Sequence, residues 1–156
     1  MLELEFEESD LNQVAERWLA DASRRSQGVQ PLRLALSGPM GAGKTTLFRA
    51  LGQLLGCSPL PTSPTYGLIQ EYRTDTGNKV VHVDLYRLNV ASDWLDLDLE
   101  AYGNDFALWV EWPEKASGYL PSSLLVYRLE VANKETPTGP DHSPGCCRRL
   151  VGPVAL

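Results

Sequence analysis

The residues best suited to chemistry lie in a glycine-rich segment, Gly-Pro-Met-Gly-Ala-Gly-Lys-Thr-Thr, at residues 38–46. It satisfies the pattern G-x-x-x-x-G-K-[ST]. Glycines let the backbone wrap around a phosphate so that several N–H groups converge on it, and the positive end of a following helix adds to the attraction. In such a loop Lys44 reaches the β and γ phosphates, where it takes part in catalysis, and Thr45 holds Mg²⁺ through its hydroxyl. The predicted nucleotide-binding residues are Gly38, Pro39, Met40, Gly41, Ala42, Gly43, Lys44, Thr45 and Thr46.

Two carboxylates end apolar runs and are candidates for the magnesium shell. Asp84 follows Val-Val-His-Val, and Glu111 follows Phe-Ala-Leu-Trp-Val. Ligands of open α/β sheets bind at the carboxyl ends of strands, where Asp84 would hold Mg²⁺ directly or through water. Glu111 would coordinate the metal shell or orient an attacking water, which makes it the candidate catalytic residue beside Lys44. The alternative for both is a solvent-facing charge on a strand.

Weaker signals come from a Pro- and Ser-rich loop and from one tryptophan. Thr65 lies in the segment Thr-Ser-Pro-Thr at residues 62–65, where switch loops that sense a nucleotide are found in many proteins with this motif. Such loops are common, so the segment alone indicates little. Trp112 adjoins Glu111 and would either stack on a ligand or partner or simply pack at a strand end.

The elements around the glycine-rich loop are those that the motif requires. Residues 32–36 form a short apolar run typical of a buried parallel strand. Leucines and Phe48 then repeat at helical spacing from Lys44 to Leu55, and Gly56 is a natural C-terminal glycine. This context disfavours the alternative of a glycine-rich turn with a chance Lys-Thr pair.

Other segments complete an α/β pattern. Residues 2–6 alternate as a strand does, and a helix with an apolar face follows from about residue 11 to the Ser-Gln-Gly at 26–28. Residues 66–72 and 79–85 flank a turn and predict a hairpin. Residues 92–102 indicate a short surface helix or irregular segment. Strands are expected at 106–110, around 124–131 and near 149–154. We predict a three-layer P-loop NTPase fold with a mixed, mostly parallel sheet flanked by helices, in one domain over residues 1–156. The tail, 131–156, is the part of this domain that the sequence pattern defines least.

Composition restricts the function classes. The formal net charge of −6 repels a polyanion, so autonomous nucleic-acid binding is not expected. No stretch approaches the roughly 18 apolar residues of a membrane span, and the acidic start is unlike a secretory signal. We expect a soluble, cytoplasmic protein without membrane association.

The three cysteines, Cys57, Cys146 and Cys147, are an odd number, and two of them are neighbours. A disulfide framework is therefore not indicated, and a reducing compartment fits. His142 with Cys146 would begin a metal site, but a full zinc site needs about four ligands and no second pair is present. A loop with chance thiols is the simpler interpretation.

Four ordered motifs within residues 38–114, GPMGAGKTT, SPTYGLIQEY, HVDLYRL and VEWPE, resemble those of the TsaE (YjeE) family of small bacterial ATPases. The resemblance covers roughly residues 1–121. It implies a role in making N6-threonylcarbamoyladenosine at position 37 of tRNAs that read codons beginning with A. It also implies ATP and Mg²⁺ as cofactors, TsaB and TsaD as partners, contact with tRNA only through that complex, and ATP hydrolysis that resets the complex between turnovers.

The resemblance gives individual residues their roles. The family's metal-binding threonine corresponds to Thr45, its Walker B aspartate to Asp84, and its catalytic or metal-linked glutamate to Glu111. The switch-like threonine corresponds to Thr65, and the tryptophan beside the glutamate to Trp112.

This chain departs from the family pattern in two places. Pro39-Met40 replaces the more usual Asp-Leu, at positions where the backbone touches phosphate. The tail reproduces no family pattern, and Arg148 is the candidate for a basic residue that it contributes to the nucleotide.

Two other functions remain open. Shikimate kinase carries a very similar MGAGK loop in a chain of comparable size, so a small-metabolite kinase is one alternative. Such a kinase needs an arginine-bearing lid and a glycine-rich substrate loop, whereas this sequence has no Gly-Gly pair. The second alternative is an ATP-gated interaction module with negligible hydrolysis. It overlaps with the first interpretation, because a protein of charge −6 that serves tRNA is expected to hydrolyse slowly alone and faster with partners.

Overall fold

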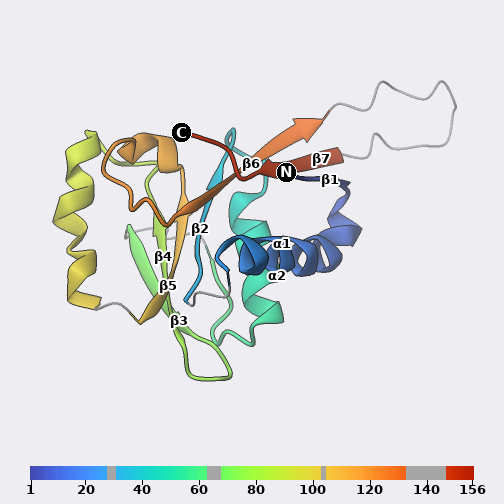
Figure 1. Cartoon of the computed structure of the whole chain (residues 1–156), viewed down its shortest axis with the longest axis horizontal. Coiled ribbons are helices and arrows are strands. Elements are labelled where there is room, and N and C mark those ends of the chain that lie inside the picture. Colours follow the sequence, from blue (N-terminus) through green and yellow to red (C-terminus); the bar gives the residue numbers. More distant parts are fainter. Residues whose placement is uncertain (28–30, 63–67, 103–104, 133–146) are drawn as a thin grey trace, which may run out of the picture.

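The computed structural model describes residues 1–27, 31–62, 68–102, 105–132 and 147–156. Within them, seven strands form one sheet in the order β1-β7-β6-β2-β5-β4-β3 (Figure 1). The strands are β1 (Leu2–Phe6), β2 (Arg33–Ser37), β3 (Ile69–Arg73), β4 (Lys79–Asp84), β5 (Phe106–Glu111), β6 (Leu125–Ala132) and β7 (Cys147–Gly152). The predicted hairpin is β3 and β4, paired antiparallel with Ile69 opposite Val83.

The centre of the sheet is parallel and its edges are antiparallel. Strands β6, β2, β5 and β4 run parallel to their neighbours. Strand β3 is antiparallel to β4, β7 is antiparallel to β6, and β1 is antiparallel to β7. Because β7 is antiparallel to β6 and β1 is antiparallel to β7, β1 runs in the same direction as the four central strands. Five of the seven strands therefore point the same way. The predicted mixed, mostly parallel sheet is confirmed.

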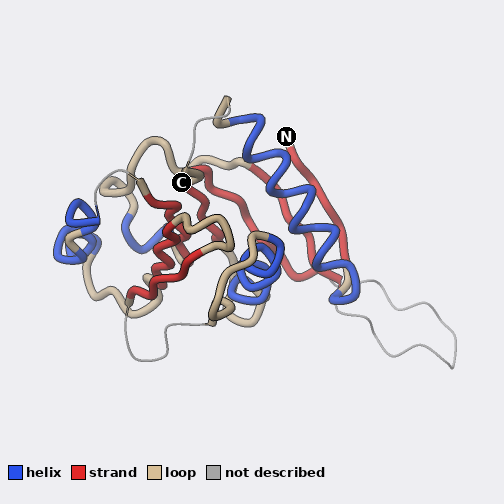
Figure 2. Tube along the Cα trace, turned by 90° about the horizontal axis from the view of Figure 1, so that it is seen from below, coloured by secondary structure: helices blue, strands red, loops and turns tan. Residues whose placement is uncertain are grey.

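Two α-helices cover one face of the sheet, α1 (Leu11–Arg25) and α2 (Lys44–Leu54) (Figures 1 and 2). In α1 the buried side chains recur every three or four residues, as the apolar pattern predicted. Trp18 of α1 meets Phe48 of α2 at a ring-centroid distance of 5.4 Å, and both are fully buried. Helix α2 ends before Gly56, whose φ of +65° is the left-handed conformation expected of a C-terminal glycine.

The opposite face is covered by 3-10 segments instead of α-helices. They are η2 (Ala91–Leu97) and η3 (Leu99–Tyr102), yellow in Figure 1, and η4 (Pro113–Ala116). Trp94 and Ala116 pack there with Val81, Val83 and Leu108 of the sheet. The third layer is thus present, built from short turns, and the segment predicted as a short helix or irregular stretch is two 3-10 helices. One further 3-10 turn, η1 (Glu8–Asp10), precedes α1.

A buried polar cluster joins α1 to the sheet. The Tyr127 hydroxyl of β6 donates to Asp21 Oδ2 at 2.9 Å, and Arg25 Nε donates to the same oxygen at 2.6 Å. Burial alone would raise the pKa of the Asp21 carboxyl, but the hydrogen bonds from Arg25 and Tyr127 outweigh it and hold this pKa below its ordinary value. Burial raises the pKa of Tyr127, and the bond to Asp21 adds to this effect. The cluster is therefore a charged, fully hydrogen-bonded link between two layers.

Within the described ranges, no helix is both long enough and apolar enough to cross a membrane.

Candidate functional site

The glycine-rich loop connects β2 directly to α2, the context that the motif requires. Gly38 has a φ of +140°, and a Cβ built on it would lie 2.1 Å from the carbonyl oxygen of Leu129, so no larger residue fits. Gly43 has a φ of +98° and occupies the N-cap position of α2. The first backbone N–H groups of this helix have no intrahelical acceptor and face the loop, which makes an anion-binding cradle.

Lys44 is folded back over the loop. Its ammonium group donates to the carbonyl oxygens of Gly38 at 2.7 Å and Pro39 at 2.9 Å. It also lies 3.7 Å from the ring centroid of Trp112, a cation–π contact. Burial lowers the pKa of Lys44, and the nearby carboxylates of Glu111, Glu114 and Asp84 oppose this shift. The lysine is thus a largely desolvated cation next to several acids.

Thr45 and Glu111 touch directly. The Thr45 hydroxyl lies 2.8 Å from Oε1 and 3.0 Å from Oε2 of Glu111, to which it donates. Glu111 is only 3% exposed, and its Oε1 lies 3.0 Å from Nε2 of His82. The carboxylate therefore belongs to a buried hydrogen-bonded cluster and is not the solvent-facing strand charge that was its alternative.

Asp84 lies beside Glu111 because β4 and β5 pair in parallel with these two residues in register. Its Oδ1 accepts a hydrogen bond from the backbone N–H of Tyr86 at 3.0 Å. Both carboxylates thus lie at the carboxyl ends of adjacent strands, next to the start of α2.

Arg148 reaches the loop from β7. Its Nε donates to the carbonyl oxygen of Ala42 at 2.9 Å, and a Cβ at Gly43 would lie 3.2 Å from the same nitrogen. The C-terminal strand thereby adds a cation to one side of the glycine-rich loop.

These groups line one pocket of about 410 Å³. Its lining residues are Met40, Gly41, Gly43, Lys44, Thr45, Thr46, Asp84, Tyr86, Glu111, Trp112 and Arg148. Most of the predicted site is therefore brought together. Gly38, Pro39 and Ala42 are not in the lining, but their carbonyl oxygens accept hydrogen bonds from Lys44 and Arg148. Thr65, His142 and Cys146 lie outside the described residues.

Sequence reasoning missed His82 and Tyr86. His82 lies two residues before Asp84, so strand alternation puts both on the same face of β4. This signal was present in the sequence, but it needs the pairing of β4 with β5 to become informative. Tyr86 stands in the same motif, HVDLYRL, but the sequence analysis assigned a role there to Asp84 alone.

The donor set suits magnesium. Among the described residues, no group of three or more His, Cys, Asp or Glu side chains could hold a metal ion alone. Magnesium in phosphate-binding sites takes one or two carboxylates and completes its shell with water and phosphate oxygens. The oxygens of Thr45, Asp84 and Glu111, all lining the same pocket, fit that requirement.

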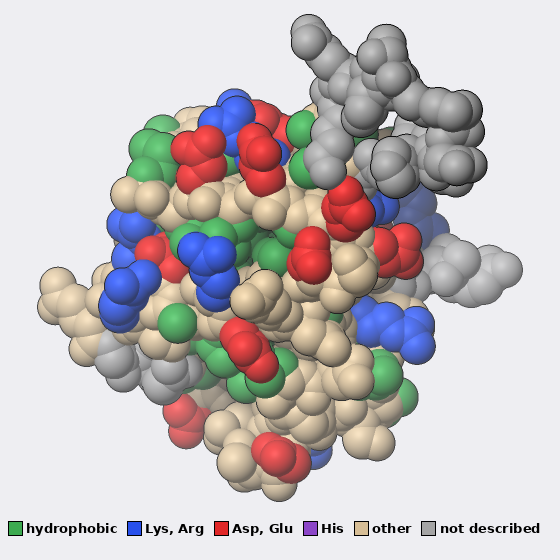
Figure 3. All heavy atoms as spheres, turned by 90° about the vertical axis from the view of Figure 1, so that its right-hand side faces the viewer, with side chains coloured by type: hydrophobic (Ala, Val, Ile, Leu, Met, Phe, Trp, Pro, Cys, Tyr) green, Lys and Arg blue, Asp and Glu red, His purple; other side chains and the backbone are tan. Residues whose placement is uncertain are grey.

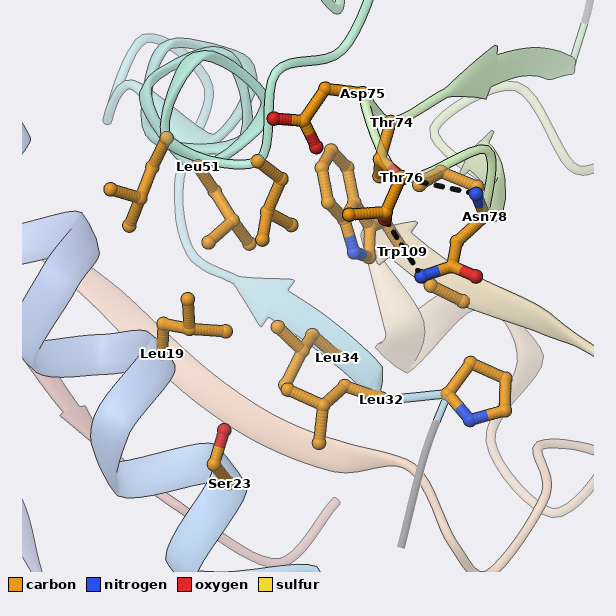
Figure 4. Close-up of a pocket in the computed structure, with 15 residues that line it drawn as sticks. Leu19, Ser23, Leu32, Leu34, Leu51, Thr74, Asp75, Thr76, Asn78 and Trp109 are labelled. Atoms are coloured by element: carbon orange, nitrogen blue, oxygen red, sulfur yellow. Dashed lines mark hydrogen bonds between the residues drawn. The ribbon is translucent and has the colours of Figure 1, made fainter. Parts of the chain in front are cut away.

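A second pocket of about 310 Å³ has a different character (Figure 4). Leu19, Leu34 and Leu51 line it together with Trp109, and the β3–β4 turn closes one side. The polar groups of that turn bond to one another, with Thr74 Oγ1 at 2.9 Å from Thr76 Oγ1. The described residues that line this pocket are mostly apolar or belong to the turn, whereas the cation, hydroxyl and carboxylates gather in the pocket at the glycine-rich loop.

The sequence is similar to those of a known protein family. A sequence model of the family described as "Threonylcarbamoyl adenosine biosynthesis protein TsaE" matches residues 6–138. Three curated relatives are each named tRNA threonylcarbamoyladenosine biosynthesis protein TsaE. The Streptomyces coelicolor protein is 41% identical over 103 residues, which are 65% of this chain and 70% of that protein. The Haemophilus influenzae protein is 38% identical, covering 61% of this chain and 60% of the relative, and the Bacillus subtilis protein is 37% identical, covering 65% and 63%. The matched part of this chain therefore spans less than two thirds of the latter two relatives.

The fold has a counterpart among solved structures. The crystal structure of YdiB from Bacillus subtilis superposes with a TM-score of 0.55 over 96% of this chain and 83% of that one. At 21% sequence identity, this likeness supports the α/β architecture alone.

Proposed function

The chain belongs to the TsaE family, and on this basis we propose that it is a P-loop ATPase of the bacterial tRNA N6-threonylcarbamoyladenosine machinery. In this proposal it hydrolyses ATP to reset a complex of TsaB and TsaD between turnovers. The family relation supports the pathway, while the hydrolytic role rests on the chemistry of the pocket.

The observation that carries the hydrolytic role is the convergence of four side chains from three elements. Lys44 and Thr45 come from the first turn of α2, Asp84 from the end of β4 and Glu111 from the end of β5. A cation, a hydroxyl and two carboxylates beside a loop of backbone N–H groups are the parts that phosphoryl transfer requires.

Binding follows from these groups. The loop amides of residues 38–46 and the Lys44 ammonium would hold the phosphates, and Arg148 would add a second cation from the side of β7. Thr45 and Asp84, with Glu111 beside them, would hold Mg²⁺. When bound, this ion neutralises charge on the β and γ phosphates. The family relation supports ATP as the nucleotide. The sequence also lacks the N-K-x-D motif that would read guanine, which disfavours GTP.

Glu111 is proposed to position the attacking water. In the reaction the water oxygen forms a bond to the γ phosphorus, the bond from that phosphorus to the β–γ bridging oxygen breaks, and ADP leaves with the bridging oxygen. The water proton passes to the Glu111 carboxylate and then to solvent. Lys44 stabilises the charge that grows on the bridging oxygen.

Net charge favours action through partners. At −6 the chain is repelled by tRNA at long range, so the proposal assigns contact with tRNA to the TsaB–TsaD complex. The face in Figure 3 carries basic and acidic side chains interspersed, without a broad basic surface. Slow hydrolysis by the isolated chain, accelerated by its partners, is the expected behaviour.

The test is steady-state ATP hydrolysis by the isolated chain and by the chain with TsaB, TsaD and tRNA. We expect stimulation of about 10-fold or more, since groups supplied by a partner can raise hydrolysis by P-loop proteins by more than this. Lys44→Ala is the control and should abolish the stimulated rate. Rapid hydrolysis that the partners do not change would contradict the proposal, and phosphorylation of a small hydroxylated metabolite would favour a kinase. Tight ATP binding without turnover in either condition would favour an ATP-gated interaction module.

A further inference from the structure

His82 is a fully buried histidine in contact with the proposed catalytic carboxylate. Its side chain is 0% exposed, and its Nε2 lies 3.0 Å from Glu111 Oε1. The roles derived above for Lys44, Thr45, Asp84 and Glu111 do not use it. A polar ring in this position needs an explanation, because burying a polar group costs free energy unless the group is hydrogen-bonded.

The direction of the hydrogen bond follows from the two partners. The proposed role of Glu111 in taking a proton from water requires an ionised carboxylate, which can only accept hydrogen bonds, so in that state His82 Nε2 carries a proton and donates a hydrogen bond to Glu111. The other ring nitrogen, Nδ1, is buried and has no hydrogen-bond partner among the described residues. With the proton on Nε2, the atom left unpaired is an acceptor and not an N–H. The single hydrogen bond of this ring is therefore directed at Glu111.

Aromatic packing fixes the ring. Phe48 lies 5.2 Å from His82, Tyr72 lies 6.3 Å away and Trp109 lies 6.5 Å away, measured between ring centroids. Phe48 is three residues after Thr45 on α2, so the helix that carries the hydroxyl also packs against the histidine. Such packing restricts the ring to one orientation, and that orientation presents Nε2 to the carboxylate.

The hydrogen bonds on Glu111 are unequal. Among the described residues, Oε1 accepts from both Thr45 and His82, whereas Oε2 accepts from the Thr45 hydroxyl alone. The Thr45 hydroxyl has one proton, which the two oxygens share. His82 therefore anchors Oε1 independently of Thr45, and Oε2 keeps more capacity to accept a hydrogen bond from a water molecule.

We propose that His82 is a positioning residue that holds Oε1 of Glu111, so that the carboxylate keeps its orientation while Thr45 engages the magnesium–nucleotide. This inference rests on the proposed ATPase function. It predicts that His82 contributes to turnover and not to nucleotide affinity, because it acts through Glu111 and does not line the pocket.

The test compares His82→Leu, which removes the donor, with His82→Gln, whose amide can donate in place of Nε2. We expect His82→Leu to lower kcat about 10- to 100-fold, as loss of supporting hydrogen bonds typically does, with unchanged affinity for magnesium–ATP. His82→Gln should recover kcat to within about threefold of the wild type. Val80→Ala is the matched control: it alters a buried residue on the same face of β4, and should lower the Tm without lowering kcat.

A double variant tests whether His82 acts through the carboxylate. His82→Leu combined with Glu111→Gln should turn over no more slowly than Glu111→Gln alone, to within about a factor of two. Full additivity of the two losses, or wild-type kcat in folded His82→Leu, would overturn the positioning role while leaving the ATPase function intact. A loss of kcat in His82→Gln equal to that in His82→Leu would also overturn it. Absence of turnover in the wild type with its partners would overturn both proposals together.

Discussion

Two adjacent arginines on β7 have different surroundings. Arg148 lines the pocket and donates to the Ala42 carbonyl oxygen, whereas Arg149 pairs with Glu3 and lies within 4.0 Å of Glu130. Because successive side chains of a strand point to opposite faces, Arg148 contacts the glycine-rich loop and Arg149 lies on the other face of the sheet. The pair therefore separates a proposed nucleotide contact from a charge on the sheet surface.

This difference gives a prediction for binding. We expect Arg148→Ala to weaken magnesium–ATP binding about 10-fold, since hydrogen bonds to charged groups contribute about 1.5–3 kcal/mol. Arg149→Ala should leave the affinity unchanged and is the matched control. Isothermal titration calorimetry measures both. Equal affinities for the two variants would show that Arg148 only supports the loop or does not act on the nucleotide at all.

The sequence identified some residues of the pocket and missed others. Lys44 and Thr45 are identified by a local pattern, and Asp84 and Glu111 by their place after apolar runs. All four reach one pocket in the structure. His82 was given no role, because a histidine within the apolar run Val-Val-His-Val is equally consistent with a core position until its partner strand is known. Its partner is 29 residues away, on another strand.

Among the elements, α1 and β6 are joined by a buried polar link outside the pocket. Asp21 is 5% exposed and accepts from Tyr127 and Arg25. The pKa of this carboxyl is lower in the folded state than in the unfolded state, where it is about 3.9. Its contribution to stability is therefore fully present above that unfolded-state pKa and is lost as the pH falls through the lower, folded-state pKa.

Asp21→Asn tests this linkage. We expect the variant to have a free energy of unfolding about 1–3 kcal/mol lower than the wild type at pH 7, because it loses charged hydrogen bonds. The gap should narrow as the pH falls below 4, since protonation then removes the same interaction from the wild type. Urea denaturation at several pH values measures the gap. A difference in free energy of unfolding that stays constant down to pH 2 would contradict the assignment. Tyr127→Phe is the control: it leaves the Asp21–Arg25 pair intact and should lower the free energy of unfolding at pH 7 by less than Asp21→Asn does.

Apolar periodicity predicted most of the elements, because each uses residues close in sequence. The strands β1 to β7 and both α-helices lie near the expected positions, with β7 at Cys147–Gly152 close to the strand expected near residues 149–154. Two features were not predictable in this way. Strand β7 pairs with β1 from the other end of the chain, with Leu150 opposite Leu4, which no local pattern indicates. The segment after β4 divides at Asp98, whose left-handed φ of +46° ends η2 before η3 begins.

At the scale of the whole molecule, the sheet brings distant segments to one pocket. The loop follows β2 at its centre, the two carboxylates come from β4 and β5 on one side, and Arg148 comes from β7 on the other. Both ends of the chain thus support the site, because β1 pairs with the strand that carries Arg148. The sequence predicted the layers and the sheet type, whereas the strand order depends on long-range packing.

The most direct test of hydrolysis through Glu111 is whether Glu111→Ala abolishes ATP turnover while leaving nucleotide binding intact. Magnesium–ATP affinity and steady-state hydrolysis are measured for this variant and the wild type in the presence of TsaB, TsaD and tRNA. We expect an affinity within about threefold of the wild type and a loss of kcat of about 100-fold or more, because the carboxylate acts mainly on the attacking water. Wild-type kcat in the variant would contradict the claim that this pocket hydrolyses ATP through Glu111.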